Sequence, residues 1–280
     1  MTQNVNPLKQ FFRQPAIYLR LPSDGRHWPK NALNMPENKE LPIFPMTAID
    51  EITYRTPDAV FNGQAVVNVI QSCAPNIKDA WSIPGVDLNA ILIGIRIASY
   101  GHNMEFETVC PHCAESSEFG LDLRTVLDQM RSPDYSRTIK QGDLEVFFKP
   151  MTYKNLNDNN HSQFEEQKIL QMLPDAEIPD QQKITALSEA MKKLTDVTVN
   201  ALVQSIAAVK TPDSMVTETA YIAEMLKNCD RRLFNQIRDH IISIKGEAEI
   251  KPLKLKCNSC NQEYEQAVTL DMSSFFEVAS

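Results

Sequence analysis

The chain has 280 residues, of which 23% are charged and 42% hydrophobic, a composition typical of a globular protein rather than a disordered one. Its net charge is -8, and its longest basic stretch, Lys251, Lys254 and Lys256, is too small for the segregated basic face that nucleic-acid binding would require. No apolar run approaches the ~20 residues that span a bilayer and the N-terminus lacks a hydrophobic signal core, so we predict a soluble protein of a cytoplasm-like compartment without a membrane partner.

Residues 1–55 predict an extended N-terminal arm, because ten of the 17 prolines of the chain lie in its first 85 residues. Within the arm, residues 16–21 alternate like a strand before a turn at 22–25, and residues 41–44 predict a second short strand. Five aromatic side chains are candidate anchors for a partner protein: Phe11, Phe12, Tyr18, Trp28 and Phe44. The alternative, that these rings cover the protein's own core, stays open.

Two strand-to-helix junctions share one local pattern. Residues 44–47 read Phe-Pro-Met-Thr, and residues 148–152 repeat this order with one lysine inserted after the phenylalanine. Thr47 is followed three positions later by Asp50, which is the spacing of a helix cap. We therefore expect the same device, a strand followed by proline and a threonine cap, to begin a helix in both places.

Residues 56–103 predict a helical segment. Its main helix is predicted to be capped by Asp87, to have an apolar face, and to end at Gly101. That face consists of Leu88, Ile91, Leu92, Ile95 and Ala98. Arg96 lies beside it, and we expect a surface or salt-bridged arginine there, with an interface contact as the alternative.

Residues 151–245 predict a helical insertion, because residues 153–245 contain no glycine and are rich in helix-forming residues. We expect helices near 160–172, 180–209, 215–227 and 230–244, with Gly246 ending the helical section. In the second helix the apolar face is predicted to consist of Ile184, Leu187, Met191, Leu194, Val197, Ala201 and Ile206. The methionines at 172, 191, 215 and 225 are expected to fill the core rather than to form a functional surface.

Four of the six cysteines form two CxxC pairs with the spacing of zinc knuckles. The candidate ligands are Cys110, Cys113, Cys257 and Cys260. A strand is predicted on each side of both pairs, at 104–109, 117–123, 253–256 and 264–270. The alternative is one redox CxxC pair and one coincidental pair, but neither lies in the βαβ setting of thioredoxin-like chemistry.

The two pairs are unusually far apart, with 143 residues between Cys113 and Cys257. A typical zinc ribbon separates its pairs by about 15–20 residues. We therefore predict an α+β fold with a small β-rich zinc-ribbon module in two distant halves, residues 104–150 and 246–280. The helical domain at 151–245 is inserted between these halves, and the extended proline-rich arm precedes them.

A catalytic zinc normally keeps one coordination position open for water, whereas four thiolates close the shell, so we expect a structural Zn²⁺. His112 is a less favoured replacement ligand. The remaining histidines at 27, 102, 161 and 240 are scattered, Cys73 and Cys229 are expected to be buried thiols, and no GxSxG, Walker, GxGxxG or HExxH motif is present. The sequence therefore predicts neither an enzyme nor a small-molecule substrate.

Several segments, taken in order, resemble the baseplate protein family of T4-type contractile-tailed phages. These are Leu21-Pro22-Ser23-Asp24-Gly25, Pro45-Met46-Thr47 with Asp50-Glu51, Asn62-Gly63 leading to Val69-Ile70-Gln71-Ser72-Cys73, and Asp87 through Ile95-Arg96-Ile97-Ala98-Ser99-Tyr100-Gly101 before the first CxxC pair. The resemblance covers roughly residues 17–152 and the helical remainder only loosely.

This resemblance implies a late phage protein of the baseplate hub or of its assembly pathway. Its partners would be other baseplate and tail proteins, and its location would be the virion tail baseplate, with the host cytoplasm during assembly. Two alternatives remain, an assembly chaperone absent from the mature virion and a zinc-ribbon accessory protein that binds nucleic acid. The second predicts a basic ribbon surface, whereas no Lys or Arg lies between residues 97 and 123.

Overall fold

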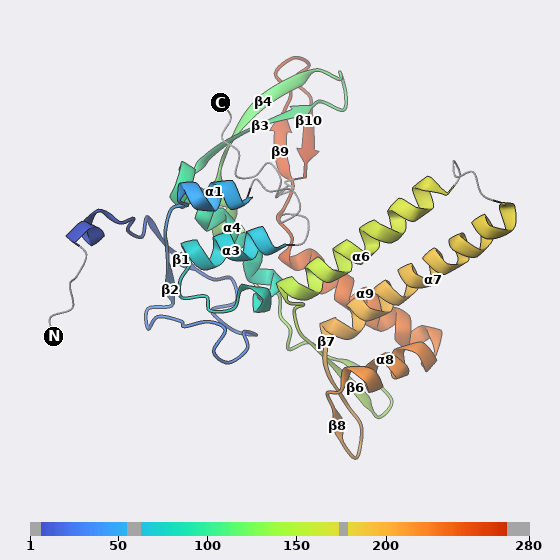
Figure 1. The fold of residues 1–280 in the computed structure, drawn as a ribbon. Helices are drawn as coiled ribbons and strands as arrows, with labels where there is room; N and C mark the ends of the chain where they lie inside the picture. The colour runs from blue at the N-terminus through green and yellow to red at the C-terminus, as the bar shows by residue number, and fades with distance from the viewer. Residues whose placement is uncertain (1–6, 55–62, 174–178, 268–280) are drawn as a thin grey trace. The chain divides into compact units, whose positions relative to one another are not determined.

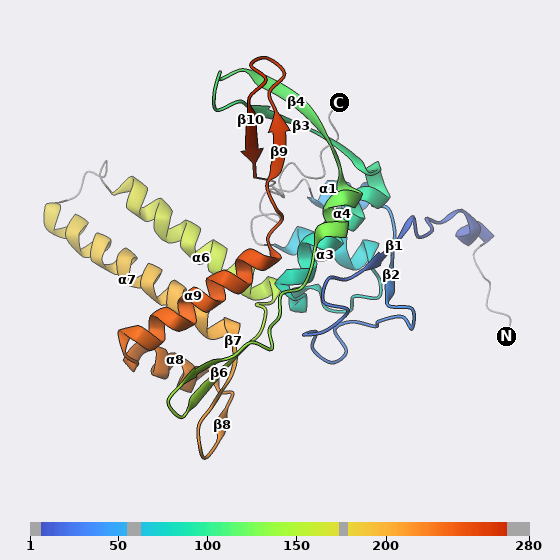
Figure 2. The ribbon, with the colours of Figure 1, turned by 180° about the vertical axis from the view of Figure 1, so that it is seen from behind.

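The computed structural model describes residues 7–54, 63–173 and 179–267, and the statements below concern these residues (Figure 1, Figure 2). Helices are combined with small antiparallel sheets, which confirms the predicted α+β class. The expectations that fall on residues 1–6, 55–62 and 268–280 lie outside the described part of the chain.

The chain divides into two compact units. The first contains the segments Met1–Ala80, Asp87–Met130 and Ile250–Ser280, and the second contains Trp81–Val86 and Arg131–Glu249. In sequence, the main segment of the second unit is therefore inserted between the two CxxC pairs of the first. This segment begins at Arg131 rather than at residue 151, because the strands at 139–141 and 144–148, which were predicted to belong to the ribbon module, pair within the second unit.

The N-terminal segment is part of the first unit's core. β1 (Ile17–Arg20) pairs antiparallel with β2 (Glu40–Ile43), and the opposed Leu19 and Leu41 are both buried. In each strand more buried and less buried residues alternate, so one face of the hairpin packs inward while the other is nearer to water. The extended arm predicted for residues 1–55 is therefore not confirmed where the structure describes it.

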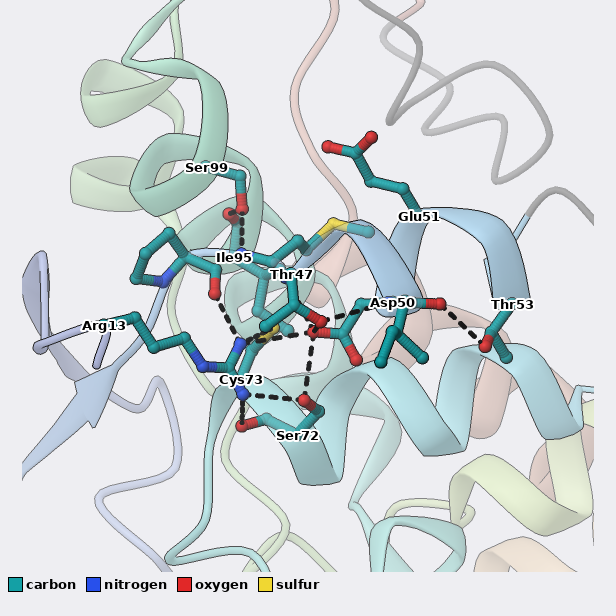
Figure 3. A network of polar contacts seen from close by, with 12 residues as sticks. Arg13, Thr47, Asp50, Glu51, Thr53, Ser72, Cys73, Ile95 and Ser99 are labelled. Carbon is teal, nitrogen blue, oxygen red and sulfur yellow. Dashed lines mark hydrogen bonds and ion pairs between the residues drawn. The ribbon is translucent and has the colours of Figure 1, made fainter. Parts of the chain in front are cut away.

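Arg13 fastens this segment to the helices that follow it. Its Nη1 donates to the carbonyl oxygen of Pro45 at 2.5 Å and to Asp50 Oδ2 at 3.2 Å. Its Nη2 donates to the carbonyl and hydroxyl oxygens of Ser72 at 2.8 and 2.7 Å. Figure 3 shows the guanidinium enclosed by these acceptors, with Asp50 also accepting from Thr47 and Ser72.

The two strand-to-helix junctions fold as predicted. Thr47 begins α1 (Ala48–Tyr54): its N–H donates to Asp50 Oδ2 at 2.8 Å, and the N–H of Asp50 donates to Thr47 Oγ1 at 3.2 Å. Thr152 begins α6 (Tyr153–Met172) with the same reciprocal pair to Asn155, at 3.2 and 3.3 Å. Both pairs are capping boxes, which satisfy N–H groups that have no partner inside the helix.

Thr152→Ala is expected to lower the free energy of unfolding of the second unit by about 1 kcal/mol, because the Oγ1 acceptor of the cap is lost. Thr152→Ser keeps an equivalent hydroxyl and should stay within a few tenths of a kcal/mol of the wild type. Urea unfolding followed by helical circular dichroism would measure both variants. Equal stability of the alanine and serine variants would show that the cap contributes nothing.

α4 (Gly85–Tyr100) is the central helix of the first unit and follows α3 (Gln64–Cys73) and η2 (Ala80–Ser82). Its apolar residues are buried on more than the single face that was predicted, since Ile93 is as fully buried as Ile91. A helix that is apolar on most sides requires neighbours on most sides. β1 is one of them, because a Cβ added at Gly94 would lie 3.2 Å from Leu19 Cδ2. The helix ends before Gly101, whose φ is +86°, as predicted.

The second unit is built on one four-stranded antiparallel sheet in the order β5-β6-β7-β8. Its strands are β5 (Ile139–Gln141), β6 (Leu144–Phe148), β7 (Ile206–Lys210) and β8 (Met215–Val216). Besides α6, its helices are α7 (Asp180–Ser205), α8 (Thr219–Asn228) and α9 (Arg231–Ala248). One buried cluster joins Val146 of β6 to Leu202 of α7, Ile222 of α8 and Ile237 of α9.

At residues 206–216 the structure differs from the predicted helices at 180–209 and 215–227, because it has strands there. The chain leaves α7 after Ser205 and enters β7, where Ile206 and Val209 are buried. The helical spacing of the apolar residues continues through Ile206, but pairing with β6 satisfies this backbone instead. Tertiary pairing overrides helix propensity at this point. Gly246 does not end α9, which continues to Ala248.

The first half of α7 also departs from the prediction. Ile184, Leu187 and Met191 belong to the predicted apolar face, yet they are 67%, 48% and 55% exposed. Met172 and Met215 are exposed as well, so three of the four methionines do not fill the core, whereas Met225 packs against it. The sheet and the later helices cover only the second half of α7, where Val199, Leu202 and Val203 are buried.

Candidate metal centre

Two hairpins of the first unit carry the CxxC pairs. β3 (Asn103–Val109) pairs with β4 (Ser116–Asp122), which leads into α5 (Leu123–Gln129), and β9 (Leu253–Lys256) pairs with β10 (Glu263–Gln266). The hairpins lie side by side in both ribbon views (Figure 1, Figure 2). Thr108 Oγ1 on β3 donates to Gln266 Oε1 on β10 at 2.6 Å. The structure thus has a strand on each side of both CxxC pairs, as predicted.

Each CxxC pair occupies a turn of the same geometry. In both turns the N–H of the first cysteine donates to the carbonyl oxygen five residues later, and the residue after the second cysteine donates back to the first cysteine's carbonyl oxygen. These four hydrogen bonds are 2.9–3.0 Å long. Ala114 and Asn261 follow the second cysteines and have φ of 59° and 60°, the left-handed conformation that reverses the chain. The two halves are therefore related by local pseudosymmetry.

The four sulfur atoms have the spacing of a tetrahedral metal site. Cys110 Sγ lies 3.8 Å from Cys260 Sγ, Cys113 Sγ lies 3.7 Å from Cys257 Sγ, and all four atoms are within 4.8 Å of one another. A tetrahedron with Zn–S bonds of about 2.3 Å has edges of about 3.8 Å. The structure therefore brings all four predicted ligands together, and they could hold one metal ion.

Backbone N–H groups favour the thiolate form at Cys257. The N–H groups of Cys260 and Ser259 lie 3.5 and 3.4 Å from Cys257 Sγ, and these hydrogen bonds lower the pKa of Cys257 to about 6. A thiolate rather than a thiol is the form that binds a metal. The N–H of His112 makes the corresponding contact to Cys110 Sγ at 3.4 Å. The two N–H groups at Cys257 thus orient its sulfur and stabilise its negative charge.

Within the part of the chain that the structure describes, the arrangement offers a metal four sulfur donors and no other side chain. Cys110 and Cys257 are 1% exposed, with Tyr264 and Leu255 packed against them. His112 is exposed and lies outside the group of possible ligands. Four protein ligands complete a tetrahedral shell, so this geometry suits structural binding better than activation of a water molecule.

The five aromatic residues that were predicted as partner anchors lie in two kinds of environment. Phe11, Phe12 and Tyr18 are 75%, 55% and 63% exposed. Trp28 is half-buried and its Nε1 donates to Asp87, while Phe44 is half-buried beneath the Arg13 guanidinium, 5.9 Å from its ring centroid. Contact with a partner therefore stays a prediction, and the first three residues are the accessible ones.

The two remaining cysteines lie apart from the metal site. Cys73 is fully buried, and burial raises the pKa of its thiol to about 12, in agreement with the prediction of a buried thiol. Cys229 is only half-buried, at the end of α8. Neither thiol belongs to the cysteine cluster.

Two charged residues of α4 take roles that sequence periodicity did not indicate. Asp87 does not precede its helix as a cap; it lies in the first turn, fully buried, and accepts hydrogen bonds from Ser23 and Trp28. Arg96 is only 6% exposed and makes no salt bridge with the described residues, so the expectation of a surface or salt-bridged arginine is wrong. The one feature of the sequence that could have indicated these roles is the position of both charged residues within an otherwise apolar helix.

Comparison with protein families matches residues 14–277 to the family described as T4 bacteriophage base plate protein. The chain belongs to this family. The match includes both CxxC pairs and the helical insertion, where the sequence resemblance was only loose. Membership of a base plate family implies a location in the virion tail. No curated protein and no solved structure matches the chain. Among the described residues, no helix is both long and apolar enough to cross a membrane.

Proposed function

We propose that this base plate protein is a structural component of the tail baseplate, at or near its hub, and that it acts through protein–protein contacts during tail assembly. The observation that carries this proposal is the family match over residues 14–277. We propose no enzymatic activity and no small-molecule substrate, since the cysteine cluster supports a closed shell. The protein would assemble in the host cytoplasm and be retained in the virion.

We further propose that the four cysteines bind one structural Zn²⁺. The 3.7 and 3.8 Å sulfur–sulfur distances support this metal, because they are the edges expected for tetrahedral Zn–S coordination. Tetrahedral thiolate ligands also suit iron, and we propose zinc because four cysteines in paired CxxC motifs are the ligand set of zinc ribbons. The ion would hold the β9–β10 hairpin against β3–β4.

Exposed aromatic side chains support a contact surface in the N-terminal segment. η1 (Pro7–Phe11) presents Leu8 and Phe11 at 59% and 75% exposure, and Phe12 follows at 55%. Large apolar side chains grouped on a surface commonly mark sites where a partner binds. We propose that Phe11, Phe12 and Tyr18 contact another baseplate or tail protein.

The charges on the two hairpins weaken the alternative of nucleic-acid binding. On β9, Lys254 and Lys256 are exposed, but each lies directly opposite a glutamate of β10, Glu265 and Glu263 respectively. Opposite charges in such cross-strand positions compensate each other. On the other hairpin the exposed charged residues include Glu105, Glu107, Glu115 and Glu118. This negative surface would repel a phosphate backbone.

Quantitative mass spectrometry of purified virions tests the proposed role against that of an assembly chaperone. A structural component is expected at a fixed copy number relative to other baseplate proteins, in preparations purified by two independent methods. The chain should also remain after a high-salt wash, which screens loose electrostatic association. Its presence in assembly intermediates but not in finished virions would contradict the structural role and identify a chaperone.

A further inference from the structure

The first half of α7 has an exposed face without charged residues. Positions three and four residues apart lie on one face of a helix, and five exposed residues of α7 follow this spacing. They are Ile184, Leu187, Ser188, Met191 and Thr195. Three of the five are large apolar side chains, Ile184, Leu187 and Met191, with exposures of 67%, 48% and 55%. Large apolar side chains grouped in this way commonly mark a binding surface.

Among the described residues of the second unit, none covers this face. α6 runs beside the first half of α7 in both ribbon views (Figure 1, Figure 2), but it meets another side of the helix. There Ala190 is 2% exposed, and Lys193 Nζ lies 3.1 Å from Glu166 Oε1 of α6. The buried cluster formed with the sheet and the later helices reaches only the second half of α7, at Val199 and Leu202.

The spacing of the apolar residues specifies the kind of partner that fits. Ile184, Leu187, Met191 and the half-buried Leu194 follow one another at intervals of three, four and three positions. We call these four residues the α7 stripe. Alternating intervals of three and four are the core positions of a coiled coil, in which each side chain inserts between four residues of a facing helix. A strand repeats every two residues and does not match this spacing, so the complementary surface is another α-helix.

The α7 stripe is also complementary to itself. Intervals of three, four and three read the same in both chain directions, so an antiparallel copy of α7 presents the same spacing. Ile184 then lies opposite Leu194 of the second copy, and Leu187 lies opposite Met191 of the second copy. Such a contact uses one patch on both copies and closes after two of them. A partner chosen by charge would instead need charged residues on this face, and Ser188 and Thr195 beside the stripe are neutral.

We propose that two copies of this chain associate through antiparallel packing of their α7 stripes. The contact joins two exposed apolar surfaces, which removes Ile184, Leu187 and Met191 of both copies from water. The association goes beyond the proposed baseplate role and does not depend on it. Mass spectrometry of virions tests that role alone, so the two proposals fail by different measurements.

Sedimentation velocity of the purified full-length chain measures the association. The wild type is expected to form dimers as its concentration rises from about 1 to about 100 µM, the range of a contact smaller than the usual ~800 Å² per partner. Leu187→Glu places a charge in the stripe twice per dimer and should raise the dissociation constant at least about 100-fold. Ile242→Glu is the matched control, because this α9 residue is 60% exposed and lies outside the stripe. It should dimerise like the wild type.

A mixture of two variants tests the antiparallel register. Leu187→Glu and Met191→Lys should each be monomeric alone, because the new charge faces an apolar side chain of the second copy. Mixed in equal amounts, they should form a heterodimer, in which the glutamate of one copy meets the lysine of the other. The second contact of that heterodimer keeps the original Leu187 and Met191. Circular dichroism of each variant should match that of the wild type, since both changes are at exposed positions.

Three results would overturn the proposal. A wild type that stays monomeric up to about 100 µM would show that the stripe does not bind a second copy. Dimerisation of Leu187→Glu at the wild-type concentration would place the contact elsewhere on the chain. A mixture of the two charged variants that remains monomeric, while the wild type dimerises, would exclude antiparallel packing of Leu187 against Met191.

Discussion

Cys110→Ser and Cys257→Ser should each weaken zinc binding roughly 100-fold or more. Structural zinc binding contributes about 10–16 kcal/mol in small peptides, so an even share among four ligands is about 2.5–4 kcal/mol for each thiolate. Serine keeps the shape of the side chain but replaces the sulfur ligand. The measurement is competition with a chromophoric chelator, followed by metal analysis of the desalted protein.

The structural consequence of metal loss should be local. Apart from the cysteines, Tyr264 and Leu255 pack against the cysteine cluster and Thr108 of one hairpin donates to Gln266 of the other. Trypsin should therefore cleave faster after Lys254 and Lys256 on β9, while the helices of the second unit keep their circular dichroism. Cys229→Ser is the control, because this half-buried thiol lies outside the cluster. Unchanged zinc affinity in both ligand variants would contradict the site.

Asp87→Asn is expected to destabilise the first unit by about 3 kcal/mol, which corresponds to a fall of roughly 10 °C in its melting temperature. The carboxylate accepts from the N–H of Ser23 at 2.9 Å, from Ser23 Oγ at 2.5 Å and from Trp28 Nε1 at 2.7 Å. An asparagine replaces one acceptor oxygen with an NH₂ group that faces these donors, so at least one buried donor loses its partner. Asp24→Asn, on the more exposed Arg20–Asp24 pair of the same turn, should change stability by no more than about 0.5 kcal/mol.

Asp87 should also make stability depend on pH. Burial raises the pKa of this carboxyl above its ordinary value of 3.8, and the hydrogen bonds from Ser23 and Trp28 oppose that change only in part. The pKa of Asp87 is thus higher in the folded chain than in the unfolded chain. Protonation of Asp87 therefore stabilises the fold, fully below about pH 3.9, and this contribution is lost as the pH rises through the folded-state pKa. The stability difference between wild type and Asp87→Asn should therefore shrink as the pH is raised. A stability difference that grows as the pH is raised would contradict a raised pKa of Asp87.

The features predictable from sequence were those determined by a few neighbouring residues. The capping boxes at Thr47 and Thr152, the end of α4 at Gly101 and the strands beside each CxxC pair all depend on local chemistry. The metal site was predictable although 143 residues separate its halves, because CxxC spacing is itself a local signal and two such pairs supply one tetrahedral shell.

The features that could not be predicted depend on which distant element packs where. Residues 206–210 have apolar spacing that fits a helix, and only the presence of β6 beside them makes a strand. Leu187 and Leu202 both belong to an apolar stripe of α7, yet only Leu202 meets the core. The burial of Arg96 follows from the packing around α4, and no property of its own neighbours in sequence distinguishes it from a surface arginine.

X-ray absorption at the zinc edge, on full-length protein purified without added metal and without chelators, is the most direct test of the four-cysteine zinc site. We expect one zinc per chain, coordinated by four sulfur atoms at about 2.3 Å. Protein that contains no zinc while its thiols remain reduced, or zinc with nitrogen or oxygen ligands in place of sulfur, would contradict it.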